Sequence, residues 1–326
     1  MKLTAPSFWQ GDKPSSLSNL LLPASKVTEA LSHHRQKKPS LKVSVPVLCC
    51  GNISVGGTGK TPLALHILQK LIQRGHNPHV ITRGYGGRSK KTGHIHPQHD
   101  KAIEVGDEAM LLAQLAPTWR GPDRYANAQQ AIKAGADCLI MDDGLQDPTL
   151  HKDLAILTID GPAGFGNQRL LPAGPLRETL AEALPRLDAA VLFGEDTHNI
   201  AEQLPKSLPL LKGQLTPSPA IHQLKGRNII AFAGIGRPEK FFTMLREANL
   251  TILRTLSFPN HHIYSERDLQ HLAQLTHTPN TVLVTTEKDN VKLPSLFQQC
   301  ITTIKIEPTW HNPALQEELL DRFMSC

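Results

Sequence analysis

The sequence predicts an α/β fold in which helices cover both faces of a parallel sheet, followed by a second, smaller α/β unit. Short apolar runs alternate with helical patterns, and a glycine-rich turn separates the first buried strand from the first helix of the sheet. A stretch rich in Pro, Lys and Ser at 205–219 indicates a boundary. We therefore expect an N-terminal helical segment at 1–40, a first domain at 41–218 and a second at 219–326.

Composition limits the class of partner. The 326 residues are 40% hydrophobic and 20% charged, which excludes a disordered chain. The formal net charge of +6 favours an anionic partner such as a nucleotide, an anionic lipid or a nucleic acid. Only 3 Trp, 3 Tyr and 9 Phe are present, without the interleaving of basic and aromatic residues that single strands prefer. We expect no nucleic-acid partner.

The segment 1–40 has an amphipathic pattern. Phe8 and Trp9 precede leucines and other apolar residues at helical spacing, and a basic run extends from His33 to Lys42. An apolar helical face with an aromatic end and adjoining cations is typical of a helix at a membrane surface. Docking of the same face on the protein's own core explains the pattern equally well, and the sequence leaves both interpretations open.

A buried strand is expected at 43–50, a glycine-rich turn at 54–60, and a helix that begins at Thr61-Pro62 and ends at Gly75. Further strands are expected at 78–82, 138–141, 154–159, 188–193, 228–236, 251–257, 281–285 and 301–306. Further helices are expected after 105–108 and near 124–134, 237–248, 265–275 and 313–324. The order strand, glycine turn, helix, strand predicts a P-loop NTPase-type α/β/α sandwich for the first domain.

The glycine-rich turn is the predicted ATP-binding site. Its backbone amides would surround the phosphates, with Lys60 on the β and γ phosphates and the Thr61 hydroxyl on Mg²⁺. The usual motif begins with glycine, and this chain has Ser54 there. The phosphate-binding residues are Ser54, Val55, Gly56, Gly57, Thr58, Gly59, Lys60 and Thr61.

Two carboxylates follow a buried strand downstream of this turn. Asp142 and Asp143 end the apolar run that starts at Cys138. A carboxylate at that place reaches Mg²⁺ directly or through water. Without the glycine-rich turn, the same pattern would indicate an ordinary turn.

These motifs, taken together and in order, resemble the tetraacyldisaccharide 4′-kinases of lipid A biosynthesis, over nearly the whole chain. The segments that carry the resemblance are GNISVGGTGKTP at 51–62, RGYGG at 83–87, VGDE at 105–108, DDGLQ at 142–146, GFGN at 164–167, LLPAGPLRE at 170–178, FAGIGRP at 232–238 and FPNHH at 258–262. Three places depart from the family pattern: Ala109, the pair Asp147-Pro148, and Asn260 next to His261.

The resemblance implies an ATP- and Mg²⁺-dependent kinase that phosphorylates the 4′-hydroxyl of tetraacyldisaccharide 1-phosphate to give lipid IVA. It also implies peripheral attachment to the cytoplasmic face of the bacterial inner membrane, with the N-terminal helix as the attachment. We further expect the protein to be a monomer.

The family's catalytic residues correspond here to Asp107, as the base that takes the proton of the sugar hydroxyl, and His261 of the second domain, as its partner. Lys60 joins them. The pattern alone also fits a helix N-cap for Asp107 and a loop histidine for His261, and His262 is a rival for the partner's role.

Further polar residues of these motifs are candidate ligands. Glu178 is expected to join Thr61, Asp142 and Asp143 around the metal ion. Arginine can bind phosphate through two parallel hydrogen bonds, and surface or interdomain pairing is the alternative. The candidate substrate contacts are Asn52, Arg83, Tyr85, Arg124 and Arg177.

Two other classes share parts of the pattern. Partitioning-type, membrane-associated P-loop ATPases contain a similar loop but usually carry Lys immediately before the glycine pair, where this chain has Val55. A carrier of metal or protein cargo would need a Cys/His site that the sequence does not offer. Transfer of phosphate from ATP to a lipid disaccharide distinguishes the kinase from both.

Overall fold

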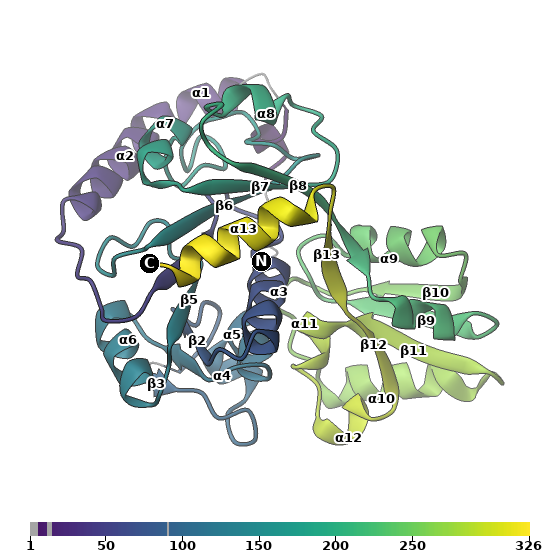
Figure 1. Ribbon diagram of the computed structural model, residues 1–326. Helices are drawn as coiled ribbons and strands as arrows, with labels where there is room; N and C mark the ends of the chain where they lie inside the picture. The colour runs from purple at the N-terminus through teal and green to yellow at the C-terminus, as the bar shows by residue number, and fades with distance from the viewer. Residues whose placement is uncertain (1–5, 12–14, 90) are drawn as a thin grey trace.

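The computed structural model describes residues 6–11, 15–89 and 91–326, which form a large and a small β-sheet (Figure 1). Residues 1–5 and 12–14 of the expected N-terminal segment lie outside this description. The large sheet has the strand order β13-β8-β7-β6-β1-β5-β2-β4-β3. Its strands are β1 (Val47–Gly51), β2 (Pro78–Thr82), β3 (Gly93–His94), β4 (Thr118–Arg120), β5 (Cys138–Asp142), β6 (Leu154–Asp160), β7 (Ala189–Phe193), β8 (Leu210–Pro217) and β13 (Ile306–Trp310).

Strand β1 lies inside this sheet, parallel to β5 on one side and β6 on the other. Because successive side chains of a strand point to opposite faces, Leu48 and Cys50 belong to one apolar layer and Val47 and Cys49 to the other. Helices α3 (Lys60–Gln73) and α13 (Pro313–Met324) pack on the first layer, and α6 (Arg124–Lys133) packs on the second. The arrangement is the predicted α/β/α sandwich.

The small sheet is parallel throughout and has the order β10-β9-β11-β12. Its strands are β9 (Asn228–Ala233), β10 (Thr251–Ser257), β11 (Thr281–Thr286) and β12 (Ile301–Ile304). Helix α9 (Pro238–Glu247) covers one face and α10 (Glu266–Gln274) the other. We call this sheet with its helices the small unit, and the large sheet with its helices the large unit.

The remaining helical segments are short, apart from α2. They are η1 (Ser7–Trp9), α1 (Ser16–Leu20), α2 (Leu22–Gln36), α4 (Ala102–Val105), α5 (Asp107–Ala113), α7 (Leu180–Ala183), η2 (Leu184–Arg186), α8 (Ile200–Gln203), η3 (Pro219–Leu224), η4 (Leu275–His277), α11 (Glu287–Asn290) and α12 (Ser295–Gln298). In Figure 1, α1 and α2 lie on the outside of the large unit, next to α7.

The N-terminal helices contact the large unit through serines. The buried hydroxyl of Ser18 donates a hydrogen bond to the Ala173 carbonyl (2.7 Å), and that of Ser25 donates to the Leu170 carbonyl (2.8 Å). Leu20, by contrast, is 75% exposed. The apolar face is therefore not docked on the protein's own core. Among the described residues, none of the helices combines the length and apolar character that crossing a bilayer requires.

Most of the expected strands and helices are present, with shifted ends. The first strand begins at Val47 instead of residue 43, since Pro46 has no N–H to donate to a neighbouring strand. The helix after the glycine-rich turn begins at Lys60, and β9 ends at Ala233.

The C-terminal part of the chain requires a larger correction. The apolar run expected as one strand at 301–306 breaks at Lys305, after which β13 pairs antiparallel with β8 of the large sheet. Helix α13 then packs beside α3, with Phe323 fully buried. Residues from Ile306 onward thus belong to the large unit and not to the expected second domain at 219–326. The boundary near 218 stays a prediction.

Candidate active site

The glycine-rich loop connects β1 to α3, so it lies at the carboxyl edge of the large sheet. Gly56 and Gly59 have φ values of 132° and 89°, which side chains rarely permit. A Cβ at Gly59 would also lie 2.7 Å from the Phe193 ring. Because the first amides of a helix have no intrahelical partner, the loop and the first turn of α3 offer backbone N–H groups to an anion.

The first half of the loop is braced by the segment 175–177. The Val55 N–H donates to the Pro175 carbonyl (2.8 Å), and Ser54 forms an antiparallel bridge with Leu176. Ser54 is therefore extended, a conformation that needs no glycine, which explains the departure from the usual motif. The buried Asn52 donates to the Thr58 hydroxyl (3.2 Å), so its side-chain amide supports the loop.

Lys60 and Arg177 both face Asp143. The Lys60 Nζ lies 3.7 Å from Asp143 Oδ1, and an Arg177 Nη lies 2.9 Å from Asp143 Oδ2. Burial acts to raise the pKa of Asp143, but the charges of Lys60 and Arg177 outweigh it and lower that pKa. Asp143 is thus a carboxylate held beside the phosphate loop by two cations.

Asp142 has a different environment. It ends β5 and is 5% exposed, and its Oδ1 has no hydrogen-bond partner among the described residues. Burial, reinforced by the charge of Asp143, raises its pKa to about 7. A buried carboxylate oxygen without a partner next to a second carboxylate is a donor set that suits a divalent cation.

Glu178, unlike Asp142, has no unpartnered oxygen that could bind a divalent cation. Its Oε1 accepts a hydrogen bond from the Gln146 side chain (2.7 Å), and its Oε2 forms an ion pair with Arg186. Both oxygens are engaged, and the residue is 1% exposed. Its position therefore favours a supporting role behind the loop over the expected place in the metal shell.

Three further candidate substrate contacts differ in their exposure. Arg124 is 2% exposed and donates to the carbonyls of Ile81 and Asp142, both at 3.4 Å, which favours a role in supporting the strand ends. Arg83 is exposed just after β2, and Tyr85 is 76% exposed. These two remain available for a substrate.

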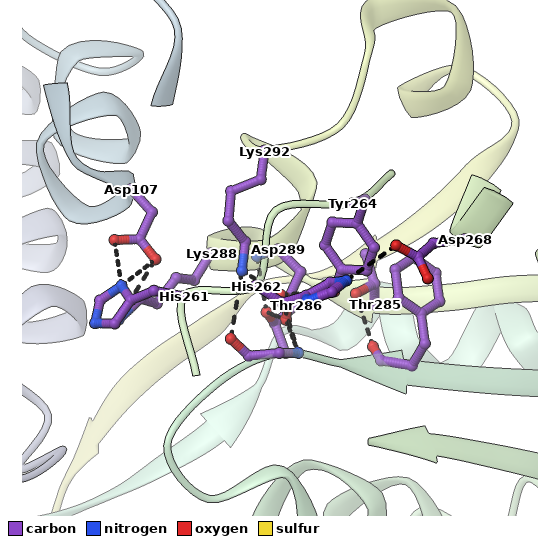
Figure 2. A network of polar contacts seen from close by, with 12 residues as sticks. Asp107, His261, His262, Tyr264, Asp268, Thr285, Thr286, Lys288, Asp289 and Lys292 are labelled. Atoms are coloured by element: carbon purple, nitrogen blue, oxygen red, sulfur yellow. Dashed lines mark hydrogen bonds and ion pairs between the residues drawn. The ribbon is translucent and has the colours of Figure 1, made fainter. Parts of the chain in front are cut away.

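Asp107 and His261 meet although 154 positions separate them in the sequence (Figure 2). The His261 Nδ1 lies 2.9 Å from each oxygen of the buried Asp107 carboxylate. The helix N-cap is Gly106, so Asp107 is not the capping residue. His262 instead lies 3.1 Å from Asp268, which leaves His261 as the histidine that faces Asp107. The Tyr85 ring packs against His261 with centroids 6.3 Å apart.

The electrostatics of this pair include a residue that the motifs did not indicate. Burial acts to raise the pKa of Asp107, but the hydrogen bond from His261 and the charge of Lys288 hold it well below its usual range. The neighbouring Glu108 has a raised pKa, mainly because it is buried. The only sequence signal for Lys288 was a charged segment directly after a buried strand.

A cavity of about 260 Å³ opens beside the glycine-rich loop. Trp9 of the N-terminal segment, the loop residues 54–58, Asp160 and Arg237 are among the residues that line it. Asp160 ends β6, and Arg237 and Lys240 of the small unit form ion pairs with it at 2.5 and 2.8 Å. The cavity therefore lies where the loop, the N-terminal segment and the small unit meet.

The fold and this site define a P-loop nucleotide-binding α/β protein with a carboxylate–imidazole pair built from both units. The family model described as tetraacyldisaccharide-1-P 4′-kinase (LpxK) matches residues 17–324. The chain is 50% identical over 321 residues to the tetraacyldisaccharide 4′-kinase of Gluconobacter oxydans, with 98% of each chain covered. It is 43% identical over 320 residues to that of Gluconacetobacter diazotrophicus, again with 98% of each covered.

A solved structure agrees. LpxK from Aquifex aeolicus in complex with ATP has a TM-score of 0.76 and 28% sequence identity, covering 94% of this chain and 99% of that one. The chain belongs to the tetraacyldisaccharide 4′-kinase family.

Substitution of Lys60 by Ala tests the phosphate site. Because the ammonium group would contact phosphate before and during transfer, we expect both ATP affinity and kcat to fall, whereas Lys70→Ala should leave both near the wild-type values. Lys70 lies on the same helix and pairs with Glu317 (3.0 Å). Calorimetric ATP titration and steady-state kinetics provide the two measurements. Unchanged ATP affinity in Lys60→Ala would contradict the assignment.

Proposed function

We propose that the protein transfers the γ-phosphoryl group of ATP to the 4′-hydroxyl of tetraacyldisaccharide 1-phosphate, giving lipid IVA in lipid A biosynthesis. The observation that carries the proposal is the contact between Asp107 and His261, within a chain whose relatives are named for this reaction. A partitioning-type ATPase has no need for a carboxylate–imidazole pair that could receive the proton of an alcohol.

ATP is bound, in this proposal, by the amides of the loop and the charge of Lys60. The Lys60 ammonium, 3.7 Å from Asp143 Oδ1, lies near enough to the loop to reach the β and γ phosphates. Arg177 stays on Asp143 and keeps that carboxylate in place.

The residues around Asp142 fit a Mg²⁺ ion. The buried Asp142 Oδ1, without a partner among the described residues, would be one ligand, and Asp143 and the Thr61 hydroxyl are the further candidate ligands. When bound, Mg²⁺ withdraws charge from the phosphates and so eases transfer. Asp142 holds its oxygen at that place because the strand end and the Arg124 side chain fix the backbone.

Asp107 receives the proton of the acceptor hydroxyl. In a loose phosphoryl-transfer transition state, the bond from phosphorus to ADP breaks early, and the hydroxyl becomes acidic as its bond to phosphorus forms. A carboxylate of low pKa can then accept the proton late in the step. His261 orients the carboxylate and offers a path for the proton to solvent, since its side chain is 32% exposed.

We also propose that the protein attaches peripherally, as a monomer, to the cytoplasmic face of the inner membrane. The leucines of α1 and α2 point away from the protein, with Leu20 75% and Leu31 58% exposed, while serines face it. The last turn of α2 adds His33, His34 and Arg35. Apolar side chains next to cations match the interface of an anionic membrane.

Purified protein with Mg²⁺, ATP labelled in its γ-phosphate, and tetraacyldisaccharide 1-phosphate tests the reaction. We expect the label to appear on the lipid, with the new phosphate at the 4′ position by mass spectrometry and NMR. A protein that hydrolyses ATP and leaves the lipid unlabelled would be an ATPase switch, and the kinase proposal would fail.

Asp107→Ala tests the role of the base. We expect kcat to fall about 10²–10⁴-fold, the usual contribution of a general base, with little change in the KM for ATP. Asp123→Ala is the control, because Asp123 caps α6 by accepting the Ala126 N–H (2.9 Å) and should affect only stability. Loss of ATP binding in Asp107→Ala would instead assign the residue to the nucleotide site.

Leu20→Gln tests membrane attachment. Burial of one leucine contributes about 1.5–3 kcal/mol, so we expect about 10- to 100-fold weaker binding to vesicles of phosphatidylethanolamine and phosphatidylglycerol in flotation assays. Leu296→Gln is the matched control, since Leu296 is 79% exposed but lies on α12 of the small unit. If both variants lost the same amount of vesicle binding, any exposed leucine would contribute to it, and the proposal of a membrane-binding helix would fail.

A further inference from the structure

Two adjacent charged residues of helix α11 in the small unit, Lys288 and Asp289, contact different parts of the protein (Figure 2). The Lys288 Nζ crosses to the large unit, where it lies 2.5 Å from Glu108 Oε1 and 3.7 Å from Asp107 Oδ2. Asp107 therefore receives two groups from the small unit, the His261 imidazole and the Lys288 ammonium. The proposed mechanism uses only the first.

The next residue fixes α11 to the loop that carries His261. Asp289 is fully buried and accepts hydrogen bonds from the Gly234 N–H (3.0 Å) and the Tyr264 hydroxyl (2.8 Å). The Gly234 carbonyl in turn accepts the His261 N–H (3.1 Å). Lys288 and His261 are thus held relative to each other by one buried network that lies within the small unit.

Charge explains what Lys288 adds. Asp107 and Glu108 are adjacent, so their two carboxylates repel each other, and loss of a neighbouring cation would raise the pKa of both. Burial lowers the pKa of Lys288, but the charges of Glu108 and Asp107 outweigh it and raise that pKa, so the amine stays protonated. The ammonium group lies next to Glu108 and Asp107, and the charge of Asp289 also acts to raise its pKa.

We propose that Lys288 is a positioning residue of the phosphoryl-transfer reaction, which keeps Asp107 ionised and turned toward His261. The inference rests on the proposed function. Lys288 acts through Asp107 and takes no proton from the substrate. Because it belongs to the small unit, Asp107 gains its full charge stabilisation only when the two units are in contact.

The test compares Lys288→Met with Lys288→Arg. An opposite charge at this distance lowers a carboxyl pKa by about 1–3 units, so the acidic limb of the kcat–pH profile should move up by about that amount in Lys288→Met. The KM for ATP and the melting temperature should change little. Lys288→Arg keeps the charge and should restore most of the profile, and Lys225→Met, at an exposed lysine of the small unit, should match the wild type.

Glu108→Gln separates positioning from simple attachment of the two units. This variant breaks the 2.5 Å ion pair but leaves Lys288 opposite Asp107, so its acidic limb should not move upward. If Lys288→Met and Glu108→Gln lose activity equally without a shift in pH dependence, Lys288 only joins the units and the proposal is wrong.

A second readout needs no lipid substrate. In ¹⁵N-histidine NMR, the midpoint at which the Asp107–His261 pair takes up a proton should rise in Lys288→Met and stay near wild type in Lys225→Met. An unchanged midpoint in Lys288→Met overturns the inference. A wild-type protein that phosphorylates no lipid yet has the NMR shift would refute the proposed function and leave the electrostatic role of Lys288 intact.

Discussion

The contact between Asp107 and His261 is the interaction on which the site depends, because each residue alone has an ordinary structural explanation. Asp107 begins α5 on the large unit, and His261 lies in a loop of the small unit with a positive φ of 57°. A left-handed conformation is unusual for histidine and is sustained here by the bond from its N–H to the Gly234 carbonyl. The site exists only where the two units hold these residues together.

Two kinds of connection maintain that juxtaposition. The chain passes between units at Ser218 and at Lys305, and these two crossings are hydrogen-bonded to each other (2.9 Å). Ion pairs complete the contact: Lys288 with Glu108 on one side, and Arg237 and Lys240 with Asp160 on the other. Since charges are costly to bury unless paired, the large unit alone would leave Glu108 and Asp160 without these cations. The charges therefore favour the arrangement in which the reacting groups meet.

Sequence patterns predicted those parts of the structure in which the interacting residues are close together in the sequence. The strand, the glycine-rich loop and α3 follow one another in sequence, and the alternation of β1 residues between two apolar layers could be read directly. Partners distant in sequence could not be read. The motifs did not indicate the ion pair of Glu178 with Arg186 or the hydrogen bonds from Arg124 to two strand carbonyls, and the places of Glu178 and Arg124 at ligands stay predictions. The return of β13 to the large sheet was invisible for the same reason.

Under the proposed membrane attachment, the N-terminal segment would connect the reaction to the origin of its acceptor. A tetraacylated sugar carries apolar chains that favour a bilayer, while its hydroxyl must reach the carboxyl edge of the large sheet. The same segment that exposes Leu20 and Leu31 also contributes Trp9 to the cavity beside the phosphate loop, and the Trp9 indole N–H donates to the Pro172 carbonyl (3.0 Å). A helix resting on the membrane would thus hold this cavity near the lipid surface. In that geometry the sugar needs to rise only a short way from the headgroup layer, and its acyl chains need not leave the bilayer fully, which avoids most of the cost of exposing them to water.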